Sequence, residues 1–227
     1  MMRWLYRMEY KYGRWAVQDL MKIIAIGQLA VYLVNYIFPA FNLISWMSLT
    51  RAGLFGGQVW RLFTFLLVPP ETSVLFVLIS LYFYYFIGSS LERTWGAFMF
   101  NAYYFIGALG AVLAALLTGY GTNYYLNMSM FLAFAILYPD FEVLLFFILP
   151  VKMKWLAIID AVIFGYSLIF GTWSTRIAIA ASLINLIIFF GPRFIQMIKA
   201  NREYAQTRRR FREQTAEWNR NNRGPYN

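Results

Sequence analysis

Ser129 stands in the segment YYLNMSMFLAFAILYPD (residues 124–140), where a polar, aromatic stretch turns into an apolar run. A serine hydroxyl attacks carbonyl carbons only when an adjacent base accepts its proton, because the neutral hydroxyl is a weak nucleophile. The chain contains no histidine and no cysteine. The base that most often activates a serine is therefore missing, and thiol chemistry is excluded.

Asp160 is the second residue whose type suggests chemistry, since it is the one acid inside a predicted membrane span. A carboxylate at such depth is costly and by default indicates function. The structural alternative is an Asp160 side chain satisfied by Tyr166, Asn185 or a backbone group. Asn127, just before Ser129, belongs to the same possible intramembrane polar site.

Metal and cofactor chemistry find little support. Without histidine or cysteine, a metal site would need clustered carboxylates, and the ten acids are scattered along the chain. No glycine-rich loop of the kind that holds phosphates is present. We expect no metal and no cofactor.

The elements that position these residues are predicted to be membrane-spanning helices. Of 227 residues, 61% are hydrophobic and only 13% are charged, about half the charged share of a soluble domain. A helix needs about 20 apolar residues to cross a bilayer. The candidate spans are 21–39, 72–89, 97–119, the short 127–138, 155–171 and 174–191. The predicted fold is an all-α bundle of six transmembrane helices.

The basic residues predict the orientation. With both termini in the cytoplasm, 17 of the 20 Lys and Arg residues lie on the cytoplasmic side, as the positive-inside rule requires. The chain then divides into a basic cytoplasmic segment (1–20), the membrane domain (21–193) and a basic tail (194–227), helical and then frayed. Basic ends of this kind favour membrane lipids over nucleic acid as partners. A bacterial cytoplasmic membrane is expected, and the endoplasmic reticulum is the alternative.

Two segments between the spans are too apolar for water-exposed loops. Residues 41–70 are predicted to form a partly inserted interfacial hairpin on the outer side, with Trp46 and Trp60 at headgroup level, and residues 141–150 are similar on the cytoplasmic side. Within span 97–119, small residues recur every four positions, and such a pattern indicates close helix packing. These residues are Gly107, Ala111, Ala115 and Gly119.

The order of these features resembles the rhomboid superfamily over residues 21–192. The segment YFIGSSLERTWGAFMFNAYYFIGALG matches the family signature at the junction of its second and third spans. GGQVWRLFT is similar to its outer loop, with Trp60 and Arg61 as the paired Trp-Arg, and ILPVKMKWLA is similar to the segment before its fifth span. The signature residues here are Gly88, Leu91, Glu92, Gly96, Phe100, Tyr103 and Gly107.

The resemblance assigns a role to each position of the membrane site. Ser129 stands at the position of the protease nucleophile, with Asn127 in place of a preceding glycine. Ser182 or Asn185 stands near the lost histidine, and Phe76 and Ser80 stand at the lost oxyanion positions. Ser129 is then expected to cap the fourth helix and to bond to Ser182 or Asn185. Trp60, Arg61, Gly88, Glu92, Gly96 and Gly107 are expected to maintain the fold.

The resemblance therefore implies a catalytically inactive rhomboid-like protein, similar in kind to Derlins, that binds transmembrane clients or partner proteins in quality control, trafficking or degradation. The alternative is a rhomboid-family serine protease with Ser129 as nucleophile and a base other than histidine. The four lysines outside the N-terminal segment argue against that alternative, because we expect them at cytoplasmic ends, opposite Ser129. A third option is a transporter or lipid-moving protein that uses Asp160 and Asn185. The sequence predicts neither the client nor the oligomeric state.

Overall fold

The computed structural model of the protein describes residues 3–70, 73–145, 149–191, 211 and 214. Residues Met2–Ile188 form one compact unit, and Met1 with Phe189–Asn227 forms a second. The account below concerns the first unit. The predicted tail, 194–227, lies almost entirely outside the described residues.

Five described helices are long and apolar enough to cross a membrane, so the chain is a multi-pass, mainly helical integral membrane protein. They are α2 (Leu20–Ile37), α6 (Val74–Trp95), α7 (Ala97–Thr118), α9 (Met153–Phe170) and the helix Trp173–Gly191, called the last helix below. Each matches one predicted span. The largest difference is that α6 continues past residue 89 to Trp95, because no glycine or proline occurs between residue 89 and Gly96.

The remaining predicted span corresponds to α8 (Tyr124–Leu137), a helix of 14 residues. At 1.5 Å per residue it is about 21 Å long, shorter than the bilayer core of about 30 Å. It begins three residues before the predicted residue 127. Nine of its residues are nevertheless buried, which places α8 inside the bundle.

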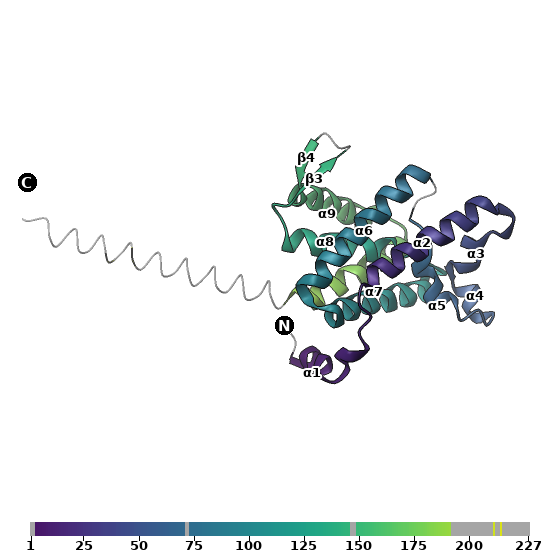
Figure 1. The fold of residues 1–227 in the computed structure, drawn as a ribbon, viewed down its shortest axis with the longest axis horizontal. Helices are drawn as coiled ribbons and strands as arrows, with labels where there is room; N and C mark the ends of the chain where they lie inside the picture. Colours follow the sequence, from purple (N-terminus) through teal and green to yellow (C-terminus); the bar gives the residue numbers. More distant parts are fainter. Residues whose placement is uncertain (1–2, 71–72, 146–148, 192–210, 212–213, 215–227) are drawn as a thin grey trace, which may run out of the picture. The chain divides into compact units, whose positions relative to one another are not determined.

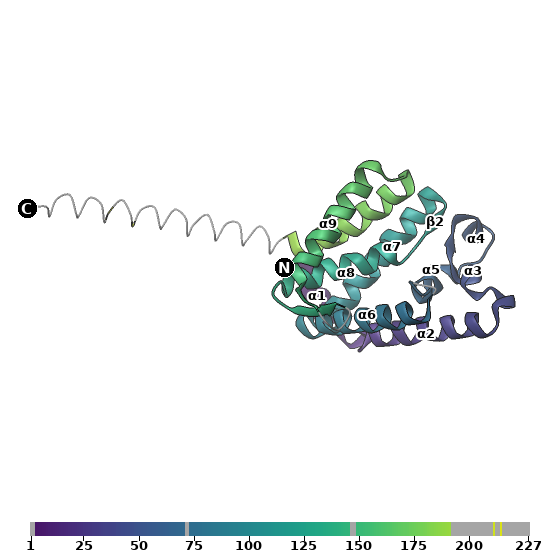
Figure 2. The same ribbon diagram turned by 90° about the horizontal axis from the view of Figure 1, so that it is seen from above.

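The helices surround α8 on several sides. Figure 2 shows α2 beside α6 along one edge, with α8 between α6 and α9. The rings of Phe83 and Phe131 (6.0 Å between centroids) and of Phe86 and Phe134 (5.7 Å) join α6 to α8. On the other side, Tyr125 of α8 lies 6.0 Å from Phe164 of α9.

The junction of α6 and α7 is held by several of the signature residues. A side chain at Gly88 would meet Met21 Cβ at 2.6 Å and Phe100 Cζ at 3.2 Å, so glycine lets α2, α6 and α7 approach one another. Glu92 Oε1 accepts a hydrogen bond from the Asp19 backbone N–H (2.8 Å). Gly96 separates the two helices with φ of 86°, a conformation in which other residues are strained.

The outer loop differs from the predicted hairpin, because it folds as a run of short helices. These elements are η2 (Pro39–Phe41), α3 (Leu43–Met47), β1 (Leu49–Thr50), α4 (Arg51–Phe55), α5 (Arg61–Thr64) and η3 (Phe65–Leu67). β1 pairs with β2 (Tyr120–Gly121), which ties the loop to the end of α7. Local turns satisfy most backbone groups here, as they must next to lipid.

Arg61 holds the centre of this loop. Its side chain is buried and donates to Gln58 Oε1 (2.6 Å), to the Ser45 carbonyl (2.8 Å) and to the Ser48 carbonyl. Trp60 Nε1 donates to the Trp46 carbonyl at 3.4 Å. The Trp-Arg pair therefore joins α5 to the chain around α3.

Two buried amides anchor the end of the loop. Gln28 Nε2 of α2 donates to the Leu66 carbonyl (2.7 Å), and Asn123 Nδ2 donates to the carbonyls of Leu66 (3.2 Å) and Val68 (2.9 Å). Carbonyl groups at the end of a helix in an apolar environment have no partner within the helix and require such donors.

The second apolar segment, 141–150, is predicted to be a hairpin, and its strand pairing confirms this. It forms an antiparallel hairpin of β3 (Glu142–Leu145) and β4 (Leu149–Lys152), visible in Figure 1. At its base, Lys154 Nζ donates to Asp140 Oδ1 (3.1 Å), and this hydrogen bond holds the pKa of Asp140 below its usual value.

The N-terminal segment contains an amphipathic helix, α1 (Arg3–Tyr12), followed by the turn η1 (Gly13–Trp15). Both contact α7. Asn101 Nδ2 of α7 donates to the Val17 carbonyl (3.1 Å) and fixes the chain between η1 and α2.

We predict that Arg61→Gln destabilises the protein by about 2 kcal/mol, because hydrogen bonds from a charged donor to three part-buried acceptors contribute about 1.5–3 kcal/mol when lost. Thermal unfolding of the purified protein in detergent measures this change. Arg51→Gln is the matched control, since the exposed Arg51 side chain makes a single long contact within the described residues, 3.5 Å to the Leu116 carbonyl. Equal melting temperatures for the two variants would contradict the assigned role of Arg61.

Candidate functional site

Ser129 lies in the second turn of α8 and is completely buried. Its hydroxyl donates to the Leu126 carbonyl (2.8 Å), and its oxygen lies 2.9 Å from the Tyr103 hydroxyl. Because the serine proton is engaged by Leu126, Tyr103 acts as the donor of the second bond. This corrects the expectation that Ser129 caps the helix. Residues 124–127 (YYLN) are also helical, so Ser129 lies inside the helix and not at its start. Its hydroxyl bonds to a carbonyl of the preceding turn, as mid-helix serines commonly do.

The two residues near the lost histidine position do not bond to Ser129. Asn185 Nδ2 donates to the Tyr103 carbonyl at 3.1 Å. Ser182 donates to the Ala178 carbonyl of its own helix at 3.1 Å. Tyr103 thus replaces Ser182 and Asn185 as the partner of Ser129, and a chain of hydrogen bonds connects α8, α7 and the last helix.

Gly107 makes this junction compact. A Cβ at Gly107 would overlap with the Leu126 side chain and lie 2.8 Å from Asn185 Nδ2. One turn further along α7, Gly110 faces Ala181 of the last helix. Small residues are expected where membrane helices pack closely, and Gly107 is the position where three helices meet.

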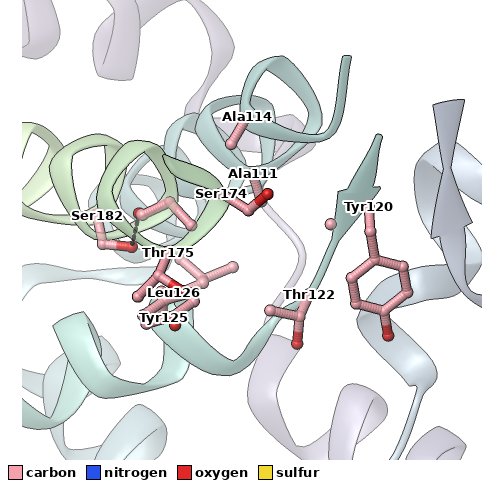
Figure 3. Close-up of a pocket in the computed structure, with 11 residues that line it drawn as sticks. Ala111, Ala114, Tyr120, Thr122, Tyr125, Leu126, Ser174, Thr175 and Ser182 are labelled. Atoms are coloured by element: carbon pink, nitrogen blue, oxygen red, sulfur yellow. Dashed lines mark hydrogen bonds between the residues drawn. The ribbon is translucent and has the colours of Figure 1, made fainter. Parts of the chain in front are cut away.

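A cavity of about 220 Å³ lies next to this junction. Figure 3 shows that its walls come from α7, the β2–α8 connection and the last helix. Six hydroxyl-bearing side chains line it: Tyr120, Thr122, Tyr125, Ser174, Thr175 and Ser182. Leu126 lines the cavity, whereas Ser129 does not. A molecule in the cavity would contact Leu126 without reaching the Ser129 hydroxyl.

The residues at the oxyanion positions do not converge on Ser129. Phe76 is 55% exposed on α6, and neither it nor half-buried Ser80 has a hydrogen bond to the site among the described residues. Asn127 is completely buried, and neither side-chain atom of its amide has a partner there. Because Phe131 contacts Phe83 one turn further along the two parallel helices, Asn127 faces α6 near Ser80.

Asp160 lies on the buried face of α9, and its Oδ2 atom has no hydrogen-bond partner among the described residues. Phe164, one turn away on the same face, contacts Tyr125 of α8. Asp160 therefore faces α8 about one turn beyond Tyr125. The Oδ2 atom makes none of the bonds that the structural alternative names, to Tyr166, Asn185 or a backbone group, within the described residues.

Two hydrogen bonds occupy the Ser129 hydroxyl. Its proton is donated to the Leu126 carbonyl, and its oxygen accepts from Tyr103. No group of three His, Cys, Asp or Glu residues with metal-binding geometry occurs within the part of the chain that the structure describes. What the arrangement does offer is a set of buried amide and carboxyl groups around α8 with free hydrogen-bonding capacity.

Sequence reasoning missed four buried polar residues. Tyr103 was noted only as a signature aromatic, and Gln28, Asn101 and Asn123 were not noted at all. A signal was present for two of them: Gln28 and Asn101 interrupt apolar spans, and polar residues at such depth usually pair with backbone or one another.

The family described as "Eukaryotic integral membrane protein (DUF1751)" matches residues 22–203. No curated protein matches the chain.

We predict that Tyr103→Phe destabilises the protein by about 0.6–1.5 kcal/mol, the usual range for a polar contact between membrane helices or a buried hydrogen bond. Tyr104→Phe is the matched control, because Tyr104 is equally buried and its hydroxyl has no partner among the described residues. Detergent unfolding of both variants, with Ser129→Ala to complete a double-mutant cycle, measures the coupling. Zero coupling between Tyr103 and Ser129 would contradict the bond.

Gly107→Leu should be much more disruptive than Gly165→Leu. Gly107→Leu inserts a side chain against Leu126 and Asn185, and such overpacking lowers the free energy of unfolding by about 1–3 kcal/mol or more. Gly165 of α9 has open space around its Cα. The yield of monodisperse protein and its melting temperature measure the difference, and equal values would show that the three helices do not meet at Gly107.

Proposed function

The chain belongs to the DUF1751 family of eukaryotic integral membrane proteins, and from this premise we propose that it is a catalytically inactive, rhomboid-like protein that binds transmembrane client helices. A eukaryotic family makes the bacterial cytoplasmic membrane, the location expected from the sequence, doubtful. We assign the protein to a eukaryotic membrane with both termini in the cytosol, because 17 of 20 basic residues then lie on that side.

The closed environment of Ser129 supports the absence of protease activity. Its oxygen accepts from Tyr103, its proton goes to Leu126, and its surface is inaccessible. Losing a general base typically lowers a rate by about 10²–10⁴. Losing an oxyanion donor lowers it by a further factor of about 10²–10³.

The half-buried side chain of Met128 on α8 supports the binding of a helix. Within residues 126–135, Met128 is the one residue of α8 that is not fully buried. Asn127 faces α6 on one side of Met128, and Asp160 approaches from α9 on the other. A client helix that contacts Met128 would therefore lie close to both unpartnered groups.

These unpartnered groups select the kind of client, and they are the observation that carries the proposal. A buried amide or carboxyl group without a partner in lipid costs several kcal/mol. A client helix with a polar residue in its span also carries a polar group without a hydrogen-bond partner. A hydrogen bond between the client's polar residue and Asn127 or Asp160 would satisfy both groups, so the protein favours marginally hydrophobic client helices. Recognition of such helices is a property that quality control or trafficking requires.

The rhomboid-like assignment is supported by the roles of the signature residues. Gly88, Glu92, Gly96 and Gly107 each make the contacts that hold α2, α6, α7 and α8 together. Arg61 organises the outer loop. These are fold-maintaining roles, which the resemblance implies for these positions.

We predict that a photo-crosslinking residue at Met128 captures a single-span reporter with a mid-helix Asn about threefold better than the same reporter with Leu. The factor follows from about 0.6 kcal/mol for one polar contact between membrane helices. Both reporters are co-expressed with the full chain, and adducts are quantified on gels. Asn127→Leu or Asp160→Leu should abolish the preference.

A crosslinking residue at Leu113 is the matched control, because Leu113 is 62% exposed and belongs to α7, a different helix from α8. Equal capture at both positions, or no preference for the Asn reporter, would overturn client selection. Ser129→Ala should leave crosslinking unchanged. Reporter fragments that disappear in Ser129→Ala would instead establish the serine protease.

A further inference from the structure

A second, larger cavity lies between the N-terminal segment and α7, far along the chain from the Ser129 junction. It has a volume of about 460 Å³ and is lined almost entirely by apolar side chains. Its walls include Met8, Tyr12 and Trp15 on one side and Phe98, Phe105 and Leu109 on the other. Nothing in the proposed client binding uses this groove.

The dimensions of the groove suit one acyl chain. Residues 98–109 of α7 cover about 16 Å at 1.5 Å per residue. One leaflet of a bilayer core is about 15 Å deep. The groove begins where α7 begins, beside the amphipathic helix α1, so it runs from the membrane surface into the leaflet next to the N-terminus.

Asn101 places a polar atom in this otherwise apolar wall. Its side chain is 6% exposed, and Nδ2 is used by the Val17 carbonyl. Its Oδ1 atom is buried and has no hydrogen-bond partner in the described part of the chain. Asn101 lies one turn into α7, and its bond to Val17 ties the N-terminal wall of the groove to the α7 wall.

The charge beside the groove is positive. Met1–Lys22 contains five Lys and Arg residues against the two acids Glu9 and Asp19. Arg7 and Lys11 are exposed on α1, one position before Met8 and Tyr12 of the groove wall. Cationic side chains at the membrane surface attract anionic headgroups.

We propose that this groove binds one anionic phospholipid, such as phosphatidylinositol. One acyl chain lies along Phe98–Leu109, and Arg7 and Lys11 balance the phosphate at the membrane surface. The bound lipid secures the N-terminal segment against α7.

Native mass spectrometry of the full chain, purified in detergent and titrated with defined lipids, tests this site. At equal concentration, phosphatidylinositol should give at least about five times more singly bound protein than phosphatidylcholine, a margin of about 1 kcal/mol. Phosphatidic acid, which is also anionic, should bind as well as phosphatidylinositol does. Equal binding of all three lipids would overturn the proposal.

Two pairs of variants locate the binding. Ala102→Phe fills the groove and should reduce phosphatidylinositol binding to the level of phosphatidylcholine, whereas Ala161→Phe on exposed α9 should not. The double substitution Arg7→Gln and Lys11→Gln should weaken binding, whereas Lys152→Gln and Lys154→Gln at the hairpin should not. Melting temperatures confirm that each variant is folded. Wild-type binding by a folded Ala102→Phe variant would overturn the assignment to this groove.

Discussion

The meeting of α7, α8 and the last helix at Gly107 is the constraint on which the rest of the membrane site depends. Lipid provides no hydrophobic drive between helices, so their association relies on close packing and hydrogen bonds. Gly107 permits the close packing by leaving room for Leu126 and Asn185. Tyr103 makes the hydrogen bonds, because its hydroxyl reaches Ser129 and its carbonyl accepts from Asn185.

The same contact explains why Ser129 is enclosed and why α8 can be short. Leu126 lines the neighbouring cavity, which Ser129 does not reach, and Tyr103 is hydrogen-bonded to the serine oxygen. Since α8 is buried among α6, α7 and α9, its ends need not reach both membrane surfaces. Asn127 of α8 and the Oδ2 atom of Asp160 on α9 have no hydrogen-bond partner in the described part of the chain.

A second constraint is that carbonyl groups of irregular backbone in an apolar environment need hydrogen-bond donors. Buried side chains supply these donors. Arg61 donates to carbonyls around α3, and Gln28 and Asn123 donate to carbonyls at the end of η3. Each of these donors comes from a different part of the chain. The outer loop is thus fixed by buried polar side chains, while apolar residues such as Phe55 and Phe63 remain exposed to the surroundings.

The sequence by itself determined the membrane class, the positions of the helices and the absence of a histidine base. These follow from apolar run length and residue type, which are local properties. It did not determine that the outer loop is helical or that α8 starts at Tyr124. Nor did it identify Tyr103 as the partner of Ser129. Only the tertiary structure decided these, because hydrogen-bond partners far apart in the chain are chosen by how closely the helices pack.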